Sequence, residues 1–181
     1  MPMFAELFVP EDSDPRPAVP AQGDEKAMLA ACLRWHRETL KLKCKDLDPG
    51  ALARRSVPFA NLSLLGFVRH LADVERRWFR RDMAGQPAGP YFQTEERPDA
   101  AFDDAVPDAE IVAEAWRLWH DEVDFADRFV AGAANLEITG TDPWRGTITL
   151  RWVLLHMIEE YGRHNGHADL LRQGIDGAVG L

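Results

Sequence analysis

Cysteine is scarce in this chain, and long apolar runs are missing. The two cysteines, Cys32 and Cys44, fall in one segment of helical periodicity, where about 18 Å of helix axis would separate them. That separation is too large for a disulfide, so we interpret both as free, buried or partly buried thiols. No stretch of about 18 uncharged apolar residues occurs, and we expect no membrane span. The N-terminus also lacks the basic and apolar regions of a signal peptide, which favours a cytoplasmic protein.

An excess of positive charge is missing as well. The 181 residues carry 21 Lys and Arg against 30 Asp and Glu, a net charge of −9 at pH 7. Clustered Lys and Arg are typical of general nucleic-acid binders, so we expect no nucleic-acid partner. The G-x-G-x-x-G, P-loop and G-x-S-x-G motifs do not occur, which leaves nucleotide-binding and serine-hydrolase functions without support. With 46% hydrophobic residues, the composition is that of a folded protein of about one domain.

Helical periodicity is what the sequence has in abundance. Apolar residues recur at spacings of three and four after residue 23, whereas residues 1–22 hold five prolines and no such period. We therefore predict an irregular N-terminal arm (1–22) followed by a single domain (23–181). Helices are predicted at 24–44, 63–82, 108–130 and 147–174. Four amphipathic helices joined by non-repeating connections favour an all-α fold, a four-helix bundle.

Two of the connections are long. Residues 86–107 hold four prolines and no helical period, and a loop of this length often covers a functional site. We interpret it as a candidate lid. Residues 131–146 are rich in Gly, Asn, Asp and Thr, and the stretch 136–139 is predicted as a short extended piece.

Three of the six histidines lie in the segment HMIEEYGRHNGH. His156, Glu160 and His164 are spaced i, i+4, i+8, which places them on one helix face, and His167 follows close to that face. The apolar Trp152 extends the face, so it is predicted to point inward, where polar groups without partners are costly. Side chains at i and i+4, about 6 Å apart, can reach one ion, so Glu160 and His164 form a candidate ligand pair. About 12 Å of helix axis separates His156 from His164, too far for both to bind one ion.

A third ligand must come from another helix, and His70 in GFVRHLADVERRW is the best candidate. Two histidines and one carboxylate suit Zn²⁺ at a catalytic site with an open position, and they also suit Ni(II) or Fe(II). A di-iron site is disfavoured, because it needs Glu-x-x-His on two helices and the pair here is a single Glu-x-x-x-His. A polar His/Glu network without any metal stays open as the structural interpretation.

Two segments, SLLGFVRHLADVERRWF and LRWVLLHMIEEYGRHNGHADLLRQGIDG, together resemble the DinB-like superfamily. More closely, they resemble its branch of small proteins that end in a His-x-Gly-His-Ala-Asp helix, and the resemblance extends from about residue 23 onward. It implies an up-down-down-up four-helix bundle with a divalent metal near one end. The family takes one histidine from the second helix and two ligands, four apart, from the last helix.

That pattern carries over to His70 and His164 directly. The position four residues before His164 is often histidine in the family and is Glu160 here; the related mycothiol-dependent maleylpyruvate isomerase branch resembles this chain in having glutamate there. His167 matches a glutamine of the family, which implies that it orients a ligand through a hydrogen bond.

The resemblance also implies an activity. Characterised members are largely thiol S-transferases or thiol-dependent isomerases that use mycothiol, bacillithiol or glutathione. We therefore expect a metal-dependent thiol S-transferase in which a mycothiol-type thiol attacks a small electrophile. His167 or His156 would orient a ligand or move a proton, and Arg163 or Arg69 would bind a carboxylate of substrate or cofactor.

Alternatives of other classes stay open at this point. The protein could be a non-catalytic, stress-related bundle that binds a metal or ligand, and a closed shell with His167 as fourth ligand would favour that function. An open position with exchangeable water would favour catalysis. Trp116 and Trp119 lie three residues apart on one predicted helix, which is compatible with a monomer or a homodimer.

Overall fold

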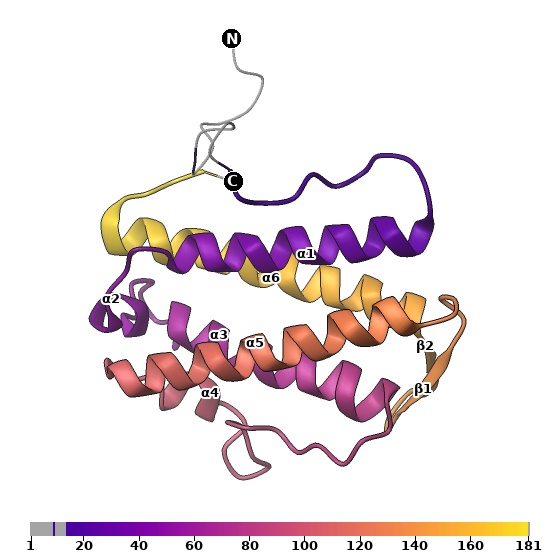
Figure 1. Ribbon diagram of the computed structural model, residues 1–181. Helices are drawn as coiled ribbons and strands as arrows, with labels where there is room; N and C mark the ends of the chain where they lie inside the picture. Colours follow the sequence, from indigo (N-terminus) through magenta and orange to yellow (C-terminus); the bar gives the residue numbers. More distant parts are fainter. Residues whose placement is uncertain (1–8, 10–13, 181) are drawn as a thin grey trace.

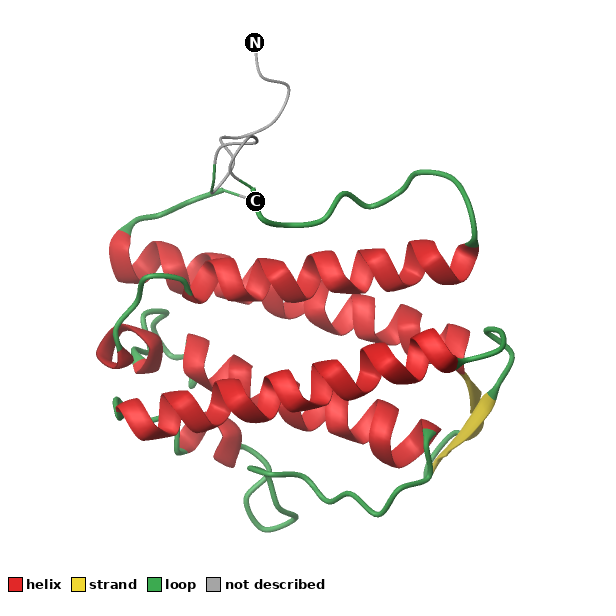
Figure 2. Ribbon diagram, viewed as in Figure 1, coloured by secondary structure: helices red, strands yellow, loops and turns green. Residues whose placement is uncertain are grey.

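The computed structural model describes Val9 and residues 14–180 of the chain. The part that it describes is mostly helical, with one small antiparallel sheet (Figures 1 and 2). The long helices are α1 (Glu25–Cys44), α3 (Leu64–Glu75), α5 (Ala109–Gly132) and α6 (Leu150–Asp176), and α3 continues directly into a π-helical segment, η2 (Arg76–Met83). The short elements are α2 (Pro49–Ala53), α4 (Ala100–Asp103), β1 (Thr139–Asp142) and β2 (Gly146–Thr149).

Each long helix begins after a side chain that caps its first turn. Asp24, Ser63 and Asp108 accept hydrogen bonds from backbone N–H groups of α1, α3 and α5, and Thr149 does the same for α6. Such caps satisfy N–H groups that have no partner within the helix. The starts predicted for the first three helices are confirmed, whereas α6 begins three residues later than predicted.

The hairpin of β1 and β2 explains that shift and corrects the all-α prediction. β2 pairs with β1 up to Thr149, so the chain stays extended until the cap of α6. Asp142 accepts hydrogen bonds from two backbone N–H groups of the turn, and Gly146 has a left-handed φ of 75°, which favours glycine. The extended piece predicted at 136–139 overlaps β1 only at Thr139, because the strand forms where a partner strand is available.

The long helices pack as neighbours along their lengths. α1 lies against α6 and α3 lies against α5, and α3 also contacts α6 (Figure 1). Their apolar stripes meet in one core, whose fully buried members include Leu40, Phe67, Trp119 and Leu154. The packing therefore brings the two helices that carry most of the candidate site residues, α3 and α6, into contact.

A buried polar network ties the four long helices together. Arg37 of α1 donates from Nε and Nη2 to the two carboxylate oxygens of Glu75 at the end of α3, at 2.7 and 2.6 Å. Tyr161 of α6 donates to Glu75 Oε1 at 2.8 Å and accepts a hydrogen bond from the indole N–H of Trp119 on α5, also at 2.8 Å. Such charge-assisted bonds in a dry interior fix how the helices sit along one another.

The connection from 86 to 107 is ordered by contacts with α3. The Asp73 carboxylate accepts hydrogen bonds from the backbone N–H groups of Tyr91, Phe92 and Gln93, at 2.5, 3.1 and 3.3 Å. The short helix α4 also forms within this connection, which the sequence does not predict. These hydrogen bonds therefore hold the middle of the connection against α3.

Residues 14–22 of the predicted N-terminal arm contain no helix or strand. Arg16 nevertheless packs its guanidinium over the Trp35 ring of α1, 4.5 Å from the ring centroid. The earlier part of the predicted arm, apart from Val9, lies outside the described residues.

Across Val9 and residues 14–180, no helix combines the length and the apolar character that crossing a membrane requires.

Candidate metal centre

The contact between α3 and α6 brings three predicted ligands together. One donor atom from each of His70, Glu160 and His164 lies within 4.8 Å of the other two. Glu160 Oε1 is 3.3 Å from His70 Nε2 and 3.3 Å from His164 Nε2. Glu160 and His164 meet because they are one turn apart on α6, whereas His70 meets them through the packing of two helices.

The charge state of this group suits a divalent cation. Hydrogen bonding from His164, and then from His70, holds the pKa of the Glu160 carboxyl well below its usual range. The carboxylate is therefore ionised, and metal binding needs deprotonated donors of this kind. The 3.3 Å separations exceed the usual length of a hydrogen bond between a charged group and its partner, so the two imidazoles hold the carboxylate only loosely. The side chains of His70 and Glu160 are each 22% exposed, which leaves the group accessible from one side.

Aromatic rings surround the two histidines. Phe67 lies with its centroid 4.8 Å from that of His164, and Phe102 of α4 lies 5.6 Å from His70. Gly66 permits this closeness, because a Cβ at that position would collide with the Phe102 ring. The rings restrict both imidazoles and keep water from one side of the group.

The two further histidines of α6 lie in different surroundings. His167 Nδ1 is 3.3 Å from His164 Nδ1, the nitrogen of His164 that faces away from Glu160, and its ring stacks on Phe67. His156 is held between Trp78 and Trp152, with ring centroids 4.7 and 5.0 Å away. Burial lowers the pKa of both imidazoles. His167 thus lies where it can orient His164, whereas His156 belongs to an aromatic stack one turn before Glu160.

The two predicted carboxylate-binding arginines are engaged elsewhere in this structure. Arg69 is buried, donates to the carbonyl oxygens of Ala100 and Ala101, and lies over the Phe92 ring at 4.1 Å. Arg163 is exposed and pairs with Glu159 at 3.5 Å. Their role in binding a carboxylate stays a prediction.

The protein's own thiols are poorly suited to nucleophilic chemistry. Neither Cys32 nor Cys44 forms a disulfide. Burial raises the pKa of both thiols, that of Cys44 to about 12. Because the thiolate is the nucleophile, Cys44 is inert near neutral pH, and burial disfavours the thiolate of Cys32 as well.

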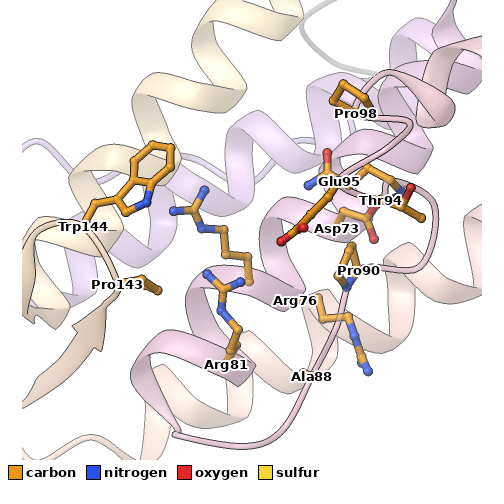
Figure 3. A pocket seen from close by; sticks show the side chains of 12 residues that line it. Asp73, Arg76, Arg81, Ala88, Pro90, Thr94, Glu95, Pro98, Pro143 and Trp144 are labelled. Carbon is orange, nitrogen blue, oxygen red and sulfur yellow. Dashed lines mark hydrogen bonds between the residues drawn. The ribbon is translucent and has the colours of Figure 1, made fainter.

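A cavity of about 620 Å³ opens beside Asp73, which follows His70 by three residues on α3 (Figure 3). Asp73 and the arginines of η2 form one side, the 88–98 part of the connection forms another, and Trp144 at the hairpin turn forms a third. The connection was predicted as a candidate lid, whereas the arginines of η2 and Trp144 were not predicted as site residues. The available signal was the run ERRWFRRD, which is also typical of a solvated helix face.

The helical fold and the His–Glu–His group are those that the DinB-like resemblance implied. The family model of mycothiol-S-transferases matches residues 28–177, and the chain belongs to this DinB-like family. The resemblance seen in the sequence is thereby confirmed, and the match includes every predicted ligand. A search of curated proteins finds no match.

Proposed function

We propose that this protein is a metal-dependent thiol S-transferase that joins a mycothiol-type thiol to a small electrophile. His70, Glu160 and His164 are the proposed ligands of a divalent metal, Zn²⁺ in the first place and Ni(II) or Fe(II) as alternatives. The observation that carries the proposal is the meeting of these three donors within 4.8 Å in a member of the mycothiol-S-transferase family. We also propose that residues 23–181 form a four-helix bundle of up-down-down-up topology. The proposed place of action is the cytoplasm.

The chemistry needs an activated thiol from outside the protein. A divalent ion held here would supply that activation, since a thiol coordinated to a metal loses its proton. Glu160 contributes the negative charge that favours a cation, and the rings of Phe67 and Phe102 limit access by water. His167, beside His164 Nδ1, is the proposed orienting group, and the inert state of Cys44 is consistent with a thiol that arrives as a small molecule.

One observation favours a second candidate, a polar network without metal. Glu160 already has both imidazoles as hydrogen-bond partners, so the group is partly satisfied without an ion. The same geometry also accommodates a non-catalytic metal site, in which His167 would complete a closed shell.

Thiol transfer itself provides the test. Metal-free protein would be assayed with mycothiol, bacillithiol and glutathione against 1-chloro-2,4-dinitrobenzene, before and after addition of Zn²⁺, Ni²⁺ or Fe²⁺. We expect conjugation with at least one thiol, restored by metal in the wild type and in His120→Ala, an exposed histidine of α5, but not in His164→Ala. Conjugation of equal rate without metal, or none with any thiol and metal, would overturn the proposal.

A further inference from the structure

The cavity that Asp73 lines has basic side chains that the proposed function does not use. Arg77 and Arg81 of η2 line it, and Trp144 and Pro143 of the hairpin turn stand opposite the loop that carries Glu95. In Figure 3 the Arg81 side chain rises between these two walls, with Trp144 on one side and Glu95 on the other. The cavity thus combines guanidinium groups with a flat indole wall.

The arginines keep donors available. Arg77 donates through Nη2 to Asp142 at 3.0 Å, and Arg81 donates through Nε and Nη2 to Asp82 at 2.7 and 3.2 Å. The Nη1 of each has no hydrogen-bond partner among the described residues. Arg77 Nε is buried and also lacks a hydrogen bond, with Asp82 3.6 Å away. Both guanidinium groups therefore have N–H groups left for a ligand.

The neighbouring acids, in contrast, are occupied. Asp82 and Asp142 are buried and accept hydrogen bonds from the arginines, and Asp142 also holds the hairpin turn. Asp73 accepts three backbone N–H groups of the connection. Glu95 lies on the exposed loop. Among the described residues of the lining, it is the one carboxylate whose oxygens accept no hydrogen bond. An incoming anion therefore meets unused donors on the η2 side, with the hydrogen-bonded Asp73 and the loop residue Glu95 as the two carboxylates of the lining.

Local structure holds the arginines in place. The π-helical η2 widens the helix where it carries both side chains, and short π-helical segments are found frequently at functional sites. The Arg77 guanidinium lies over the Trp78 ring, 4.6 Å from its centroid, and this contact restricts the conformations of the arginine side chain before a ligand binds. Fixed donors of this planar kind are suited to recognising a carboxylate.

The indole of Trp144 adds a preference for flat ligands. It is 88% exposed although it belongs to a tight, hydrogen-bonded turn. A ring stacked on it would bury apolar surface that now faces water. The turn thus presents a rigid apolar face next to cationic donors.

From this geometry we infer that the cavity binds the acceptor substrate, and that the acceptor is an aromatic electrophile bearing a carboxylate. The inference rests on the proposed function. The carboxylate binds the free Nη1 donors of Arg77 and Arg81, the ring lies against Trp144, and the reacting carbon points to the end of the cavity at Asp73, which follows His70 by three residues on α3. For a chloroarene, the thiol sulfur forms a C–S bond, the C–Cl bond breaks, chloride leaves with its electron pair, and the thiol proton passes to solvent.

Binding of an unreactive acid tests the cavity without any chemistry. Calorimetric titration would compare 3,5-dinitrobenzoate with the neutral 1,3-dinitrobenzene. Loss of one charged hydrogen-bond donor is expected to weaken binding of the acid about tenfold in Arg77→Met and in Arg81→Met, without change for the neutral ring. Trp144→Ala weakens both ligands, Glu95→Gln strengthens only the acid, and the exposed Arg117→Gln on α5 changes neither.

Two arginine variants keep this test decisive if one of them fails to fold. Circular dichroism checks each variant. Arg77→Met is the safer substitution, because Asp142 keeps the backbone N–H groups of the turn as donors, whereas the buried Asp82 accepts its hydrogen bonds from Arg81. Equal affinity for acid and neutral ring, or affinity for the acid that survives the folded arginine variants, would overturn the inference.

Kinetics then separates the inference from the proposed function. With the active thiol, 4-chloro-3,5-dinitrobenzoate should show a KM about tenfold higher in Arg81→Met, whereas that of 1-chloro-2,4-dinitrobenzene is unchanged. Transfer without preference for the acid overturns the inference and keeps the transferase. Selective binding of the acid without transfer keeps the site and overturns the transferase. A raised KM for the anionic thiol glutathione alone would place the thiol in this cavity and also overturn the inference.

Discussion

Two carboxylates at the contact between α3 and α6 are held in opposite ways. Glu75 on α3 lies in the dry core and binds Arg37 and Tyr161 at 2.6 to 2.8 Å. Glu160 on α6, the residue next to Tyr161 in the sequence, is partly exposed and lies 3.3 Å from each of two imidazoles. On α6, Tyr161 thus belongs to the buried network in the core, whereas Glu160, the residue before it, belongs to the candidate site.

The difference lies in how completely each carboxylate is satisfied. Both oxygens of Glu75 accept short hydrogen bonds from Arg37 or Tyr161, so the group is closed to further ligands. Burial raises the pKa of Glu75, and the guanidinium of Arg37 opposes that shift. Hydrogen bonds from the two imidazoles lower the pKa of Glu160, yet their donor–acceptor distances are long. The imidazoles are also partly exposed, and their nitrogens are able to bind an ion. A tightly satisfied carboxylate indicates structure, and a loosely held one beside imidazoles indicates a ligand.

Breaking the buried pair is expected to give the largest effect on stability. Arg37→Ala leaves the Glu75 charge without its main partner in a dry interior, which should cost about 3–5 kcal/mol of unfolding free energy. Arg117→Gln, which breaks an exposed pair with Asp121, should cost less than about 1 kcal/mol. Urea unfolding of metal-free protein at pH 7 measures both. Equal losses in the two variants would show that Glu75 is not the closed unit described.

The candidate site should respond in metal affinity instead of stability. Replacing His167 by Phe removes the group beside His164 Nδ1 and is expected to weaken metal binding about 10–100-fold, with one ion per chain still bound at saturation. Competition with a chromophoric chelator measures this. A loss as complete as that of His164→Ala would instead make His167 a ligand and favour the closed, non-catalytic site.

The smallest expected effect is on the acid sensitivity of folding, in which His156 and Glu160 act at different pH values. Burial holds the folded-state pKa of His156 below its ordinary value of about 6.5, so its contribution to stability is complete above that pH and is lost as the pH falls through the folded pKa. Glu160, with a lowered pKa, contributes fully above its ordinary value of about 4.5 and loses that contribution progressively only below it. Between pH 7 and 5, the fall in Tm of metal-free protein should therefore be smaller in His156→Phe than in the wild type. An identical fall in Tm in the two proteins would contradict the lowered pKa of His156.

Local spacing carried most of what the sequence could predict. Apolar residues at helical spacing placed the long helices, because this signal acts within a few residues. The one-turn spacing of Glu160 and His164 and the apolar setting of His70 indicated the group that the structure brings together.

What the sequence analysis missed depends on distant partners. Arg37 and Glu75 are of the residue types that usually face water, and the packing of the four long helices buries them as a pair. The arginines of η2 are equally typical of a solvated surface until the hairpin turn and the connection close a cavity around them. The hairpin itself needed two Thr-rich segments to pair with each other.

Metal content of the untagged protein tests the central claim most directly. Protein purified without a metal-affinity tag and loaded with Zn²⁺ should hold about one ion per chain by elemental mass spectrometry, as should His120→Ala. His70→Ala and His164→Ala, folded by circular dichroism, should each lose it. One ion per chain that survives both substitutions, or none in the wild type, would contradict the account.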